Sequence, residues 1–276
     1  MNPFGPLPDP QHLFDHDEAA QAFADILDAR ASEDEIQAFL VALTARGETM
    51  VEIAAAAQAM RDRLIPIDAP EGAIDVCGTG GDGHHTLNVS TAVSIVVAAC
   101  EVPVAKHGNR AASSKAGAAD TLEALGLDME RAGRMAEATL KDLGICFLFA
   151  ANHHPAMKRI QPIRQRIGQR TIFNLMGPLA HPARVKRQLI GIARPAYVPV
   201  YAEALQYLGT EHARVISGDE GLDELSLAGG NEVAVVTPDG IRFQRVSAAD
   251  AGLPVYPVEA IRGGDAQHNA LELRKL

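Results

Sequence analysis

Hydrophobic positions in residues 1–70 recur at the spacing of helices. The first predicted helix has an apolar face made of Ala20, Phe23, Ala24 and Leu27. Two capping boxes follow, each with a hydroxyl at the helix start and a carboxylate three residues later. The two boxes are Ser32 with Glu35 and Thr49 with Glu52. They predict helices over about Glu33 to Arg46 and about Met50 to Leu64.

From Ala73 onward the pattern changes to short apolar segments that alternate with helical ones. The predicted strands are AIDVC, VPVA, ICFLFA, QLIGIA and ARVIS. This alternation predicts an α/β domain with a mainly parallel sheet. A basic helical stretch from Pro155 to Leu179 interrupts it and is expected to pack on the N-terminal helices. The segment NEVAVVTPDGIRFQRV predicts a hairpin that turns at Pro238-Asp239-Gly240.

These patterns together predict an α/β protein that consists of a small helical domain and a larger α/β domain. A small helical domain is expected over residues 1–70, joined by helices at about 155–180. A larger α/β domain is expected over residues 73–154 and 185–276.

Composition narrows the function classes. The chain has 276 residues and a net charge of −10, which opposes binding to nucleic acid. Its longest apolar stretch, around Ala92 to Cys100, is far shorter than the roughly 20 residues of a membrane span and predicts a buried helix. Residues Met1 to Asp17 lack the pattern of a secretory signal, so we expect a cytoplasmic protein without membrane contact.

Cysteine usage fits the same compartment. The three cysteines, Cys77, Cys100 and Cys146, are widely spaced and have apolar neighbours. They are predicted to be reduced, buried thiols. No C-x-x-C or H-x3-H spacing indicates a zinc site.

The first segment with chemistry runs from Asp75 to Gly83, a strand that enters four glycines within six residues. Glycines let the backbone approach a ligand, and the helix expected near Ser90 or Thr91 offers free amides to a phosphate. An ordinary glycine turn is the alternative. The spacing matches neither the P-loop nor the dinucleotide fingerprint.

The second and third segments also follow predicted strands. Residues 106–115, KHGNRAASSK, place cations, an amide and hydroxyls after VPVA, a composition suited to phosphate oxygens. Residues 219–224, DEGLDE, follow ARVIS and supply the carboxylates that Mg²⁺ prefers. A solvated basic loop and a solvated acidic turn are the alternatives.

In combination, the motifs resemble one enzyme family. GTGGDG with T-x-N-x-S-T, KHGNR-x-x-SSK, HHPAM, T-x-FN-x-x-GPL and GLDE occur in the order found in the anthranilate phosphoribosyltransferases. The resemblance spans about Phe14 to Asn269 and implies a helical domain hinged to an α/β domain, with the active site in the cleft. It also implies Mg²⁺ as cofactor, phosphoribosyl pyrophosphate (PRPP) and anthranilate as substrates, and a homodimer formed through the helical domain.

The resemblance implies roles for individual residues, and no protein nucleophile. Those implied to bind PRPP are Gly78, Gly81, Asp82, Thr86, Asn88, Val89, Ser90, Thr91, Lys106, His107, Gly108, Asn109, Arg110, Ala111, Ala112, Ser113, Ser114 and Ala118. Those implied to hold anthranilate are Gly78, Asn109 and Arg164. Those implied to serve Mg²⁺ are Ser90, Asp223 and Glu224.

Some positions depart from the family pattern. Ala111, Ala116 and Ala118 lack hydroxyls that many relatives carry near the phosphate, and Ala151 replaces a proline beside the anthranilate pocket. Relatives continue through further helices, so we expect those C-terminal helices to be absent after Leu276. The alternatives are an impaired or nucleic-acid-binding relative, a pyrimidine nucleoside phosphorylase and a structural oligomer; KHGNR and GTGGD favour the transferase.

Overall fold

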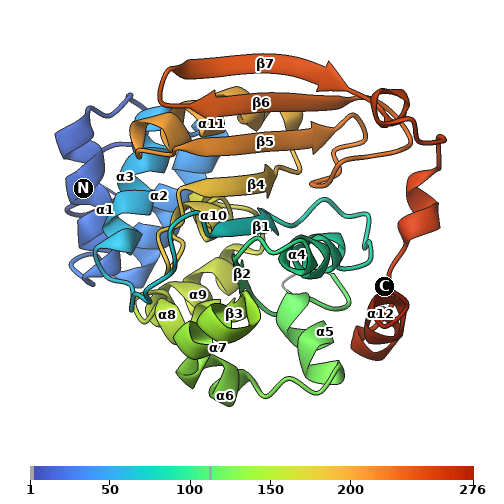
Figure 1. Ribbon diagram of the computed structural model, residues 1–276. Coiled ribbons are helices and arrows are strands. Elements are labelled where there is room, and N and C mark those ends of the chain that lie inside the picture. Colours follow the sequence, from blue (N-terminus) through green and yellow to red (C-terminus); the bar gives the residue numbers. More distant parts are fainter. Residues whose placement is uncertain (1–2, 112–113) are drawn as a thin grey trace.

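The computed structural model describes residues 3–111 and 114–276 and contains a seven-stranded sheet in the order β3-β2-β1-β4-β5-β6-β7 (Figure 1). Its strands are β1 Ile74–Gly78, β2 Val104–Gly108, β3 Ile145–Phe149, β4 Arg187–Gly191, β5 His212–Gly218, β6 Asn231–Thr237 and β7 Gly240–Val246. Strands β1 to β5 pair in parallel, and β6 and β7 add an antiparallel hairpin. The predictions of a mainly parallel sheet and of a hairpin over these residues are confirmed, and the structure places the hairpin at one edge of the sheet.

The N-terminal helices are α1 His16–Leu27, α2 Glu33–Arg46 and α3 Met50–Arg61. Both predicted capping boxes are present, so α2 and α3 begin where the sequence indicated. Helix α3 ends at Arg61, near the predicted end at about Leu64, and the chain then turns into the proline-bearing link.

The predicted apolar face of α1 was partly wrong. Phe23 and Leu27 are buried as predicted, but Ala20 is exposed, and the other buried apolar residues of α1 are Ala19, Ala22 and Ile26. The inward face is therefore rotated by about one residue from the predicted one, because alanine is apolar enough to fit either side of a helix.

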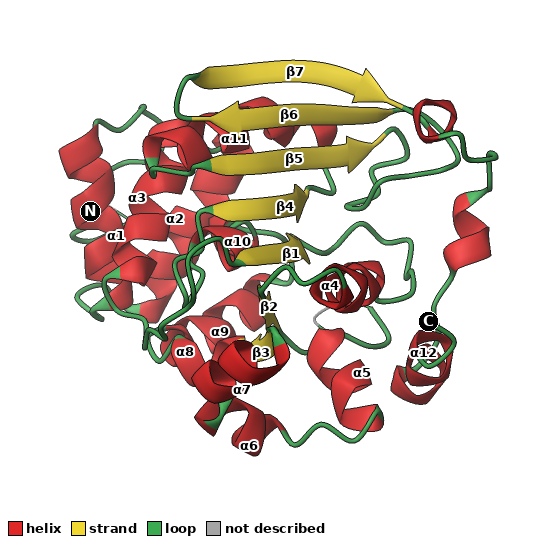
Figure 2. Ribbon diagram, in the orientation of Figure 1, coloured by secondary structure: helices red, strands yellow, loops and turns green. Residues whose placement is uncertain are grey.

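The remaining helices lie on the two faces and at one end of the sheet (Figure 2). They are α4 Val89–Ala99, α5 Ala118–Ala124, α6 Met129–Arg134, α7 Ala136–Leu143, α8 Ala150–His153, α9 Met157–Ile167, α10 Met176–Leu179, α11 Val198–Tyr207 and α12 Ala266–Leu273, with short 3-10 turns at Ile172–Asn174, Pro195–Tyr197, Ala248–Ala251 and Val258–Ile261. No helix in the described ranges is long and apolar enough to cross a membrane.

Helix α4 is less buried than predicted. It packs on β1 and β2 through one side, where Thr91 and Ser94 are buried. Ile95 and Val96 on its outer side are 37% and 49% exposed, and the thiol of Cys100 is exposed as well. The predictions of a buried helix and of a buried Cys100 were therefore wrong, because only one face of this largely apolar helix meets the sheet. Cys77 and Cys146 are buried, as expected.

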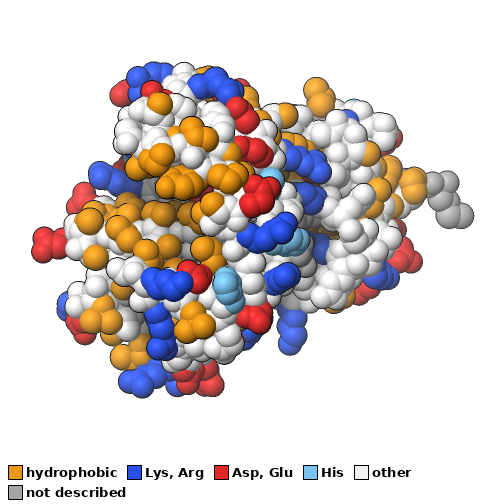
Figure 3. Space-filling view, turned by 90° about the vertical axis from the view of Figure 1, so that its right-hand side faces the viewer, with side chains coloured by type: hydrophobic (Ala, Val, Ile, Leu, Met, Phe, Trp, Pro, Cys, Tyr) orange, Lys and Arg blue, Asp and Glu red, His pale blue; other side chains and the backbone are white. Residues whose placement is uncertain are grey.

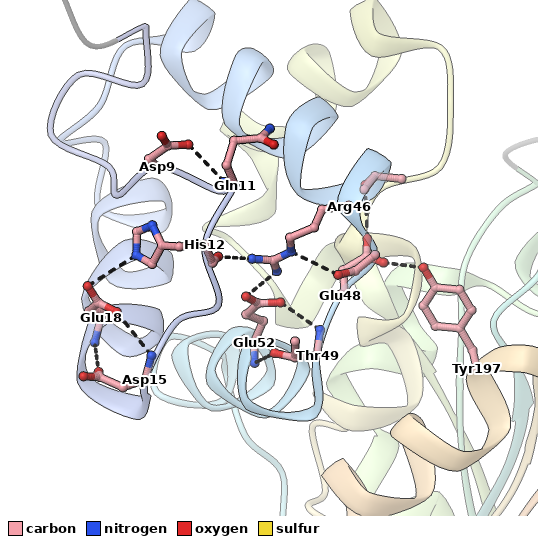
Figure 4. Close-up of polar contacts among 12 residues, drawn as sticks. Asp9, Gln11, His12, Asp15, Glu18, Arg46, Glu48, Thr49, Glu52 and Tyr197 are labelled. Carbon is pink, nitrogen blue, oxygen red and sulfur yellow. Dashed lines mark hydrogen bonds and ion pairs between the residues drawn. The ribbon is translucent and has the colours of Figure 1, made fainter.

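Segment 155–180 packs against the N-terminal helices, as the sequence predicted. Helix α9 contacts α2, and the 3-10 turn Ile172–Asn174 contacts α2 and α3. On the sheet side, the hydroxyl of Tyr197 donates a hydrogen bond to Glu48 in the α2–α3 connection (Figure 4). In the same connection, Arg46 forms an ion pair with the buried carboxylate of Glu52. The contact between Tyr197 and Glu48 joins the helical part to the segment that follows β4.

Four buried histidines lie between β2 and the helical segments. They are His107, His153, His154 and His181. The ring centroids of His107 and His154 are 5.3 Å apart, and those of His107 and His181 are 5.6 Å apart. Burial lowers the pKa of His107 and His181, and burial together with His153 and His181 lowers the pKa of His154 to about 4. His107, His154 and His181 are therefore uncharged at neutral pH.

Acid should destabilise the fold through these histidines. The unfolded chain takes up a proton on each histidine below about pH 6.5, whereas folded His154 does so only near pH 4. The unfolded state thus binds more protons in this window, and the free energy of unfolding should fall as pH falls through it. For His154 alone the loss approaches about 3 kcal/mol. Denaturant titrations between about pH 7 and about pH 4 measure this loss.

The variant His154→Gln should show a shallower decrease in unfolding free energy with falling pH. His212→Gln is the matched control, because His212 is exposed at the start of β5 and its removal should leave the decrease unchanged. Equal pH dependence in His154→Gln and the parent protein would contradict the assignment.

Candidate functional site

The candidate site lies where the strand order reverses. From β1 the chain proceeds to β2 and β3 on one side, and β4 and β5 then occupy the other side. In open α/β sheets a crevice forms outside the carboxyl ends of the strands at such a point. Here the strands end in Gly78 and Gly191, which pair across β1 and β4. The amide of Thr79 donates to the carbonyl of Gly191 over 2.9 Å.

The acidic segment after β5 sits directly on these two glycines. A Cβ atom at Gly78 would lie 2.3 Å from Oδ2 of Asp223, and one at Gly191 would lie 1.6 Å from its carbonyl oxygen. Any side chain at either position would therefore displace Asp223. The sequence predicted Gly78 and Asp223 as site residues but missed Gly191, whose only signal is a glycine inside the strand pattern QLIGIA.

The glycine-rich loop after β1 closes over Asp223. The amide of Gly80 donates to Oδ2 of Asp223 over 2.7 Å. Gly80, Gly81 and Gly83 have φ values of 70°, 77° and 79°, in the left-handed region where glycine is favoured. This loop therefore needs its glycines for backbone conformation, as the sequence predicted.

Three carboxylates converge at this point. Burial, with the neighbouring carboxylate of Asp82, raises the pKa of Asp223 to about 7. Burial, with Asp223 beside it, raises the pKa of Glu224 to about 8. The Oδ2 atom of Asp82 is buried without a hydrogen-bond partner among the described residues. This repulsion and the unused oxygen favour binding of a cation.

The chemistry of these donors fits Mg²⁺. Across the described residues, no three His, Cys, Asp or Glu side chains form a ready-made cage for a metal ion. Magnesium rarely needs one, since it keeps several waters and completes its shell with one or two carboxylates and substrate phosphates. Glu224 is held in place by the amide of Ser90, which donates to its Oε1 over 3.1 Å.

Lys106 and His107 point to opposite faces of the sheet, as adjacent residues of a strand do. The ammonium of Lys106 donates to the carbonyl of Val76 over 2.7 Å and to Oγ of Ser90 over 3.3 Å, beside Glu224. Nδ1 of His107 instead lies 2.9 Å from the carbonyl of Gly177. Lys106 therefore faces the carboxylates and the start of α4, whereas His107 belongs to the histidine cluster.

The loop after β2 is only partly directed to the crevice. Asn109 is exposed, and its Oδ1 accepts from the amide of Arg110 over 2.8 Å. The guanidinium of Arg110 pairs with Asp120 and Glu123 and lies over the ring of Phe149. Its side chain is thus engaged with α5. Ala112 and Ser113 lie outside the described residues.

The remaining described residues of this loop contact the loop itself and the start of α5. The amide of Ala111 donates to Oδ2 of Asp120 over 2.9 Å, and Oγ of Ser114 donates to the carbonyl of Ala116 over 3.3 Å. Ala118 begins α5 and would contact any Cβ at Gly108 at 3.2 Å. Among the described residues, the hydroxyl of Ser114 forms no other hydrogen bond, so this one contact is its contribution to the loop structure.

The residues before and at the start of α4 have structural partners as well. The side chain of Asn88 contacts Ala116, Thr121 and Asn269 and thereby ties α4 to α5 and α12. Thr86 forms a β-bridge with Arg262. Val89 and Ser90 form the first turn of α4, and the hydroxyl of Thr91 is buried without a partner in the described chain.

Arg164 on α9 is a half-buried cation without a carboxylate partner in the described ranges. Its Nη1 donates only to the side chain of Gln161, over 3.4 Å, and burial lowers the pKa of its guanidinium. An anionic ligand would satisfy it.

Figure 3 views the end of the molecule where α4, α5 and α12 lie, and acidic, basic and histidine side chains gather toward the middle of that face.

The chain is similar throughout to proteins of known family. The family model described as "Glycosyl transferase family, a/b domain" matches residues 70–276, and that described as "Glycosyl transferase family, helical bundle domain" matches residues 11–64. The chain thus has a small N-terminal helical domain and a larger α/β domain. The predicted fold class is confirmed.

Relatives of high identity share one name. The chain is 80% identical to the anthranilate phosphoribosyltransferase of Sphingopyxis alaskensis, covering 100% of this chain and 83% of the relative. It is 71% identical to that of Novosphingobium aromaticivorans, covering 98% of this chain and 82% of the relative.

Solved structures agree. The anthranilate phosphoribosyltransferase from Thermus thermophilus has a TM-score of 0.88 at 39% identity, covering 100% of this chain and 82% of that one. The Saccharomyces cerevisiae enzyme in complex with PRPP and Mg has a TM-score of 0.88 at 26% identity, covering 99% of this chain and 79% of that one. The resemblance seen in the sequence motifs is confirmed, and this chain belongs to the anthranilate phosphoribosyltransferase family.

Proposed function

We propose that this chain transfers the 5-phosphoribosyl group of PRPP to the amine of anthranilate, giving N-(5-phosphoribosyl)anthranilate and pyrophosphate. This reaction is the second step of tryptophan synthesis from chorismate. The observation that carries the proposal is the meeting of the glycine loop, Lys106 and the carboxylates of Asp223 and Glu224 at the strand crossover. The yeast relative was solved with PRPP and Mg.

The pyrophosphate of PRPP would lie between the glycine loop and the start of α4. The free amides of the first helical turn and the positive end of the helix dipole attract phosphate oxygens. Lys106 adds a buried cation beside Ser90. The proposed PRPP residues include those named from the family motifs, among which the side chains of Arg110 and Asn88 have mainly structural partners.

Asp223, Glu224 and Ser90 are the proposed magnesium residues. Bound Mg²⁺ would neutralise the pyrophosphate as it leaves. The protein holds the two carboxylates for this purpose through the amides of Gly80 and Ser90, which donate to them. Because both amides point at carboxylate oxygens, the acidic pair stays fixed even though its charges repel.

Anthranilate would bind on the other side of the ribose. Arg164 has no carboxylate partner among the described residues, and its planar guanidinium matches the carboxylate of anthranilate. Asn109 and the backbone at Gly78 would orient the amine. The C1–O bond to pyrophosphate breaks, the C1–N bond forms, and the ammonium proton passes to water. An aromatic amine is unprotonated near neutral pH, so orientation and exclusion of water are the main tasks of the protein.

We propose a cytoplasmic homodimer that forms through the helical domain. The helical domain would comprise residues 1–70 with about 155–180, which fits the contacts of α9 with α2.

Anthranilate fluorescence measures the reaction directly. Mixing the purified chain with PRPP, anthranilate and Mg²⁺ should decrease anthranilate fluorescence, and omission of PRPP or addition of EDTA should prevent the decrease. A folded protein that gives no decrease would contradict the proposed function. Release of a free base from a pyrimidine nucleoside and phosphate would instead identify the phosphorylase.

The double variant Asp223→Asn with Glu224→Gln tests the acidic pair. Amide oxygens can still accept from Gly80 and Ser90, so the fold should persist while the negative charge is lost. We expect kcat/KM to fall by about a hundredfold or more in the fluorescence assay, since the electrostatic contribution to such a reaction is several kcal/mol. Asp219→Asn with Glu220→Gln is the matched control in the same loop and should remain active. Full activity of the first variant would remove the metal assignment.

Arg164→Ala should mainly weaken the use of anthranilate. Loss of a paired guanidinium should raise KM for anthranilate by about tenfold to a hundredfold, with a smaller change in KM for PRPP. Steady-state assays with each substrate varied in turn separate the two constants. An unchanged KM for anthranilate would show that its carboxylate binds elsewhere.

A further inference from the structure

Arg170 lies against the glycine loop, although no motif of the sequence pointed to it. It follows α9 and is half-buried. Its Nη1 donates to the carbonyl of Gly80 over 2.8 Å and to the carbonyl of Gly81 over 3.1 Å. One cationic group therefore holds two successive carbonyls of the loop.

The contact between Arg170 and the loop carbonyls also sets the direction of the neighbouring amides, because the peptide unit is planar and trans. In each peptide unit the N–H points away from the C=O of the preceding residue. Fixing the carbonyls of Gly80 and Gly81 therefore turns the amides of Gly81 and Asp82 away from Arg170. Neither amide donates a hydrogen bond within the part of the chain that the structure describes. Two adjacent free amides form an anion-binding surface.

The close approach of Arg170 depends on glycine. A Cβ atom at Gly81 would lie 2.6 Å from Nη1 of Arg170. Burial and the neighbouring Arg194 lower the pKa of the Arg170 guanidinium, and the carboxylates of Asp223 and Asp82 oppose part of this shift. Arg170 thus lies close to the acidic centre of the site while its hydrogen bonds go to the backbone.

The segment that carries Arg170 is anchored in the helical side of the molecule. The next residues, Ile172 and Phe173, are 0% and 4% exposed and belong to the same core as α1 to α3. The rings of Phe173 and Phe23 are 6.5 Å apart in an edge-on arrangement. A cavity lined by Thr44, Glu48, Arg194 and Tyr197 borders the other side of Arg170. The arginine therefore connects the helical side with the phosphate loop.

We infer that Arg170 is a positioning residue for PRPP. It orients the amides of Gly81 and Asp82 toward the pyrophosphate by holding the carbonyls behind them, and it makes the loop depend on the placement of the helical domain. This role rests on the proposed function, because it assigns the loop to PRPP.

Three variants test the role. Arg170→Gln should raise KM for PRPP by about tenfold to a hundredfold, because it loses about 1.4 to 3 kcal/mol of charged hydrogen bonding. The same variant should change KM for anthranilate by less than about threefold. Arg170→Lys keeps a cationic donor on a different side-chain geometry and should recover part of the loss. Arg166→Gln is the control: it is exposed near Arg170 and pairs with Glu33 over 3.2 Å, so its removal should leave both constants unchanged.

A readout without substrate separates orientation from stability. In the substrate-free protein, the backbone amide resonances of Gly81 and Asp82 should shift in Arg170→Gln and return toward their original positions in Arg170→Lys, while the midpoint of thermal unfolding stays the same. An unchanged KM for PRPP, unshifted resonances, or an equal rise in both KM values would overturn the inference. If the parent protein itself fails to consume anthranilate, the proposed function fails; the resonances still report whether Arg170 orients the loop.

Discussion

The site depends on the close contact between Asp223 and two glycines at the ends of β1 and β4. Only hydrogen atoms at Gly78 and Gly191 leave room for the backbone and carboxylate of Asp223. The glycine loop closes on Asp223 through the amide of Gly80, and Glu224 is the next residue of the same segment.

The contact has an electrostatic cost that suits the proposed chemistry. Burial and the carboxylate of Asp82 raise the pKa of Asp223 to about 7, and burial and Asp223 raise that of Glu224 to about 8. Burying neighbouring carboxylates lowers the stability of the fold unless a cation binds them, since paired or solvated carboxylates are more stable. Lys106 and Arg170 offset part of the repulsion from the protein side, and Mg²⁺ with PRPP would offset the remainder.

Local signals in the sequence predicted the elements well and the spatial relations less well. The capping boxes at Ser32 and Thr49 mark helix starts because both partners lie within one turn. Burial of α4 and Cys100 was mispredicted, because hydropathy does not reveal which face of a helix meets the sheet. Arg170 and Gly191 were missed for a different reason, because their partners lie 90 and 32 residues away in the chain. The proposed roles of the loop residues stay predictions from family motifs.

The variant Gly191→Ala tests the central constraint most directly. Its new Cβ would meet the carbonyl of Asp223 at 1.6 Å, so the acidic segment must move, whereas Gly177→Ala meets nothing within 4 Å and serves as control. Calorimetric titration with PRPP in the presence and absence of Mg²⁺ should show that Gly191→Ala loses the magnesium-dependent gain in affinity, by about tenfold or more, while the control keeps it. An undiminished magnesium-dependent gain in Gly191→Ala would contradict the account.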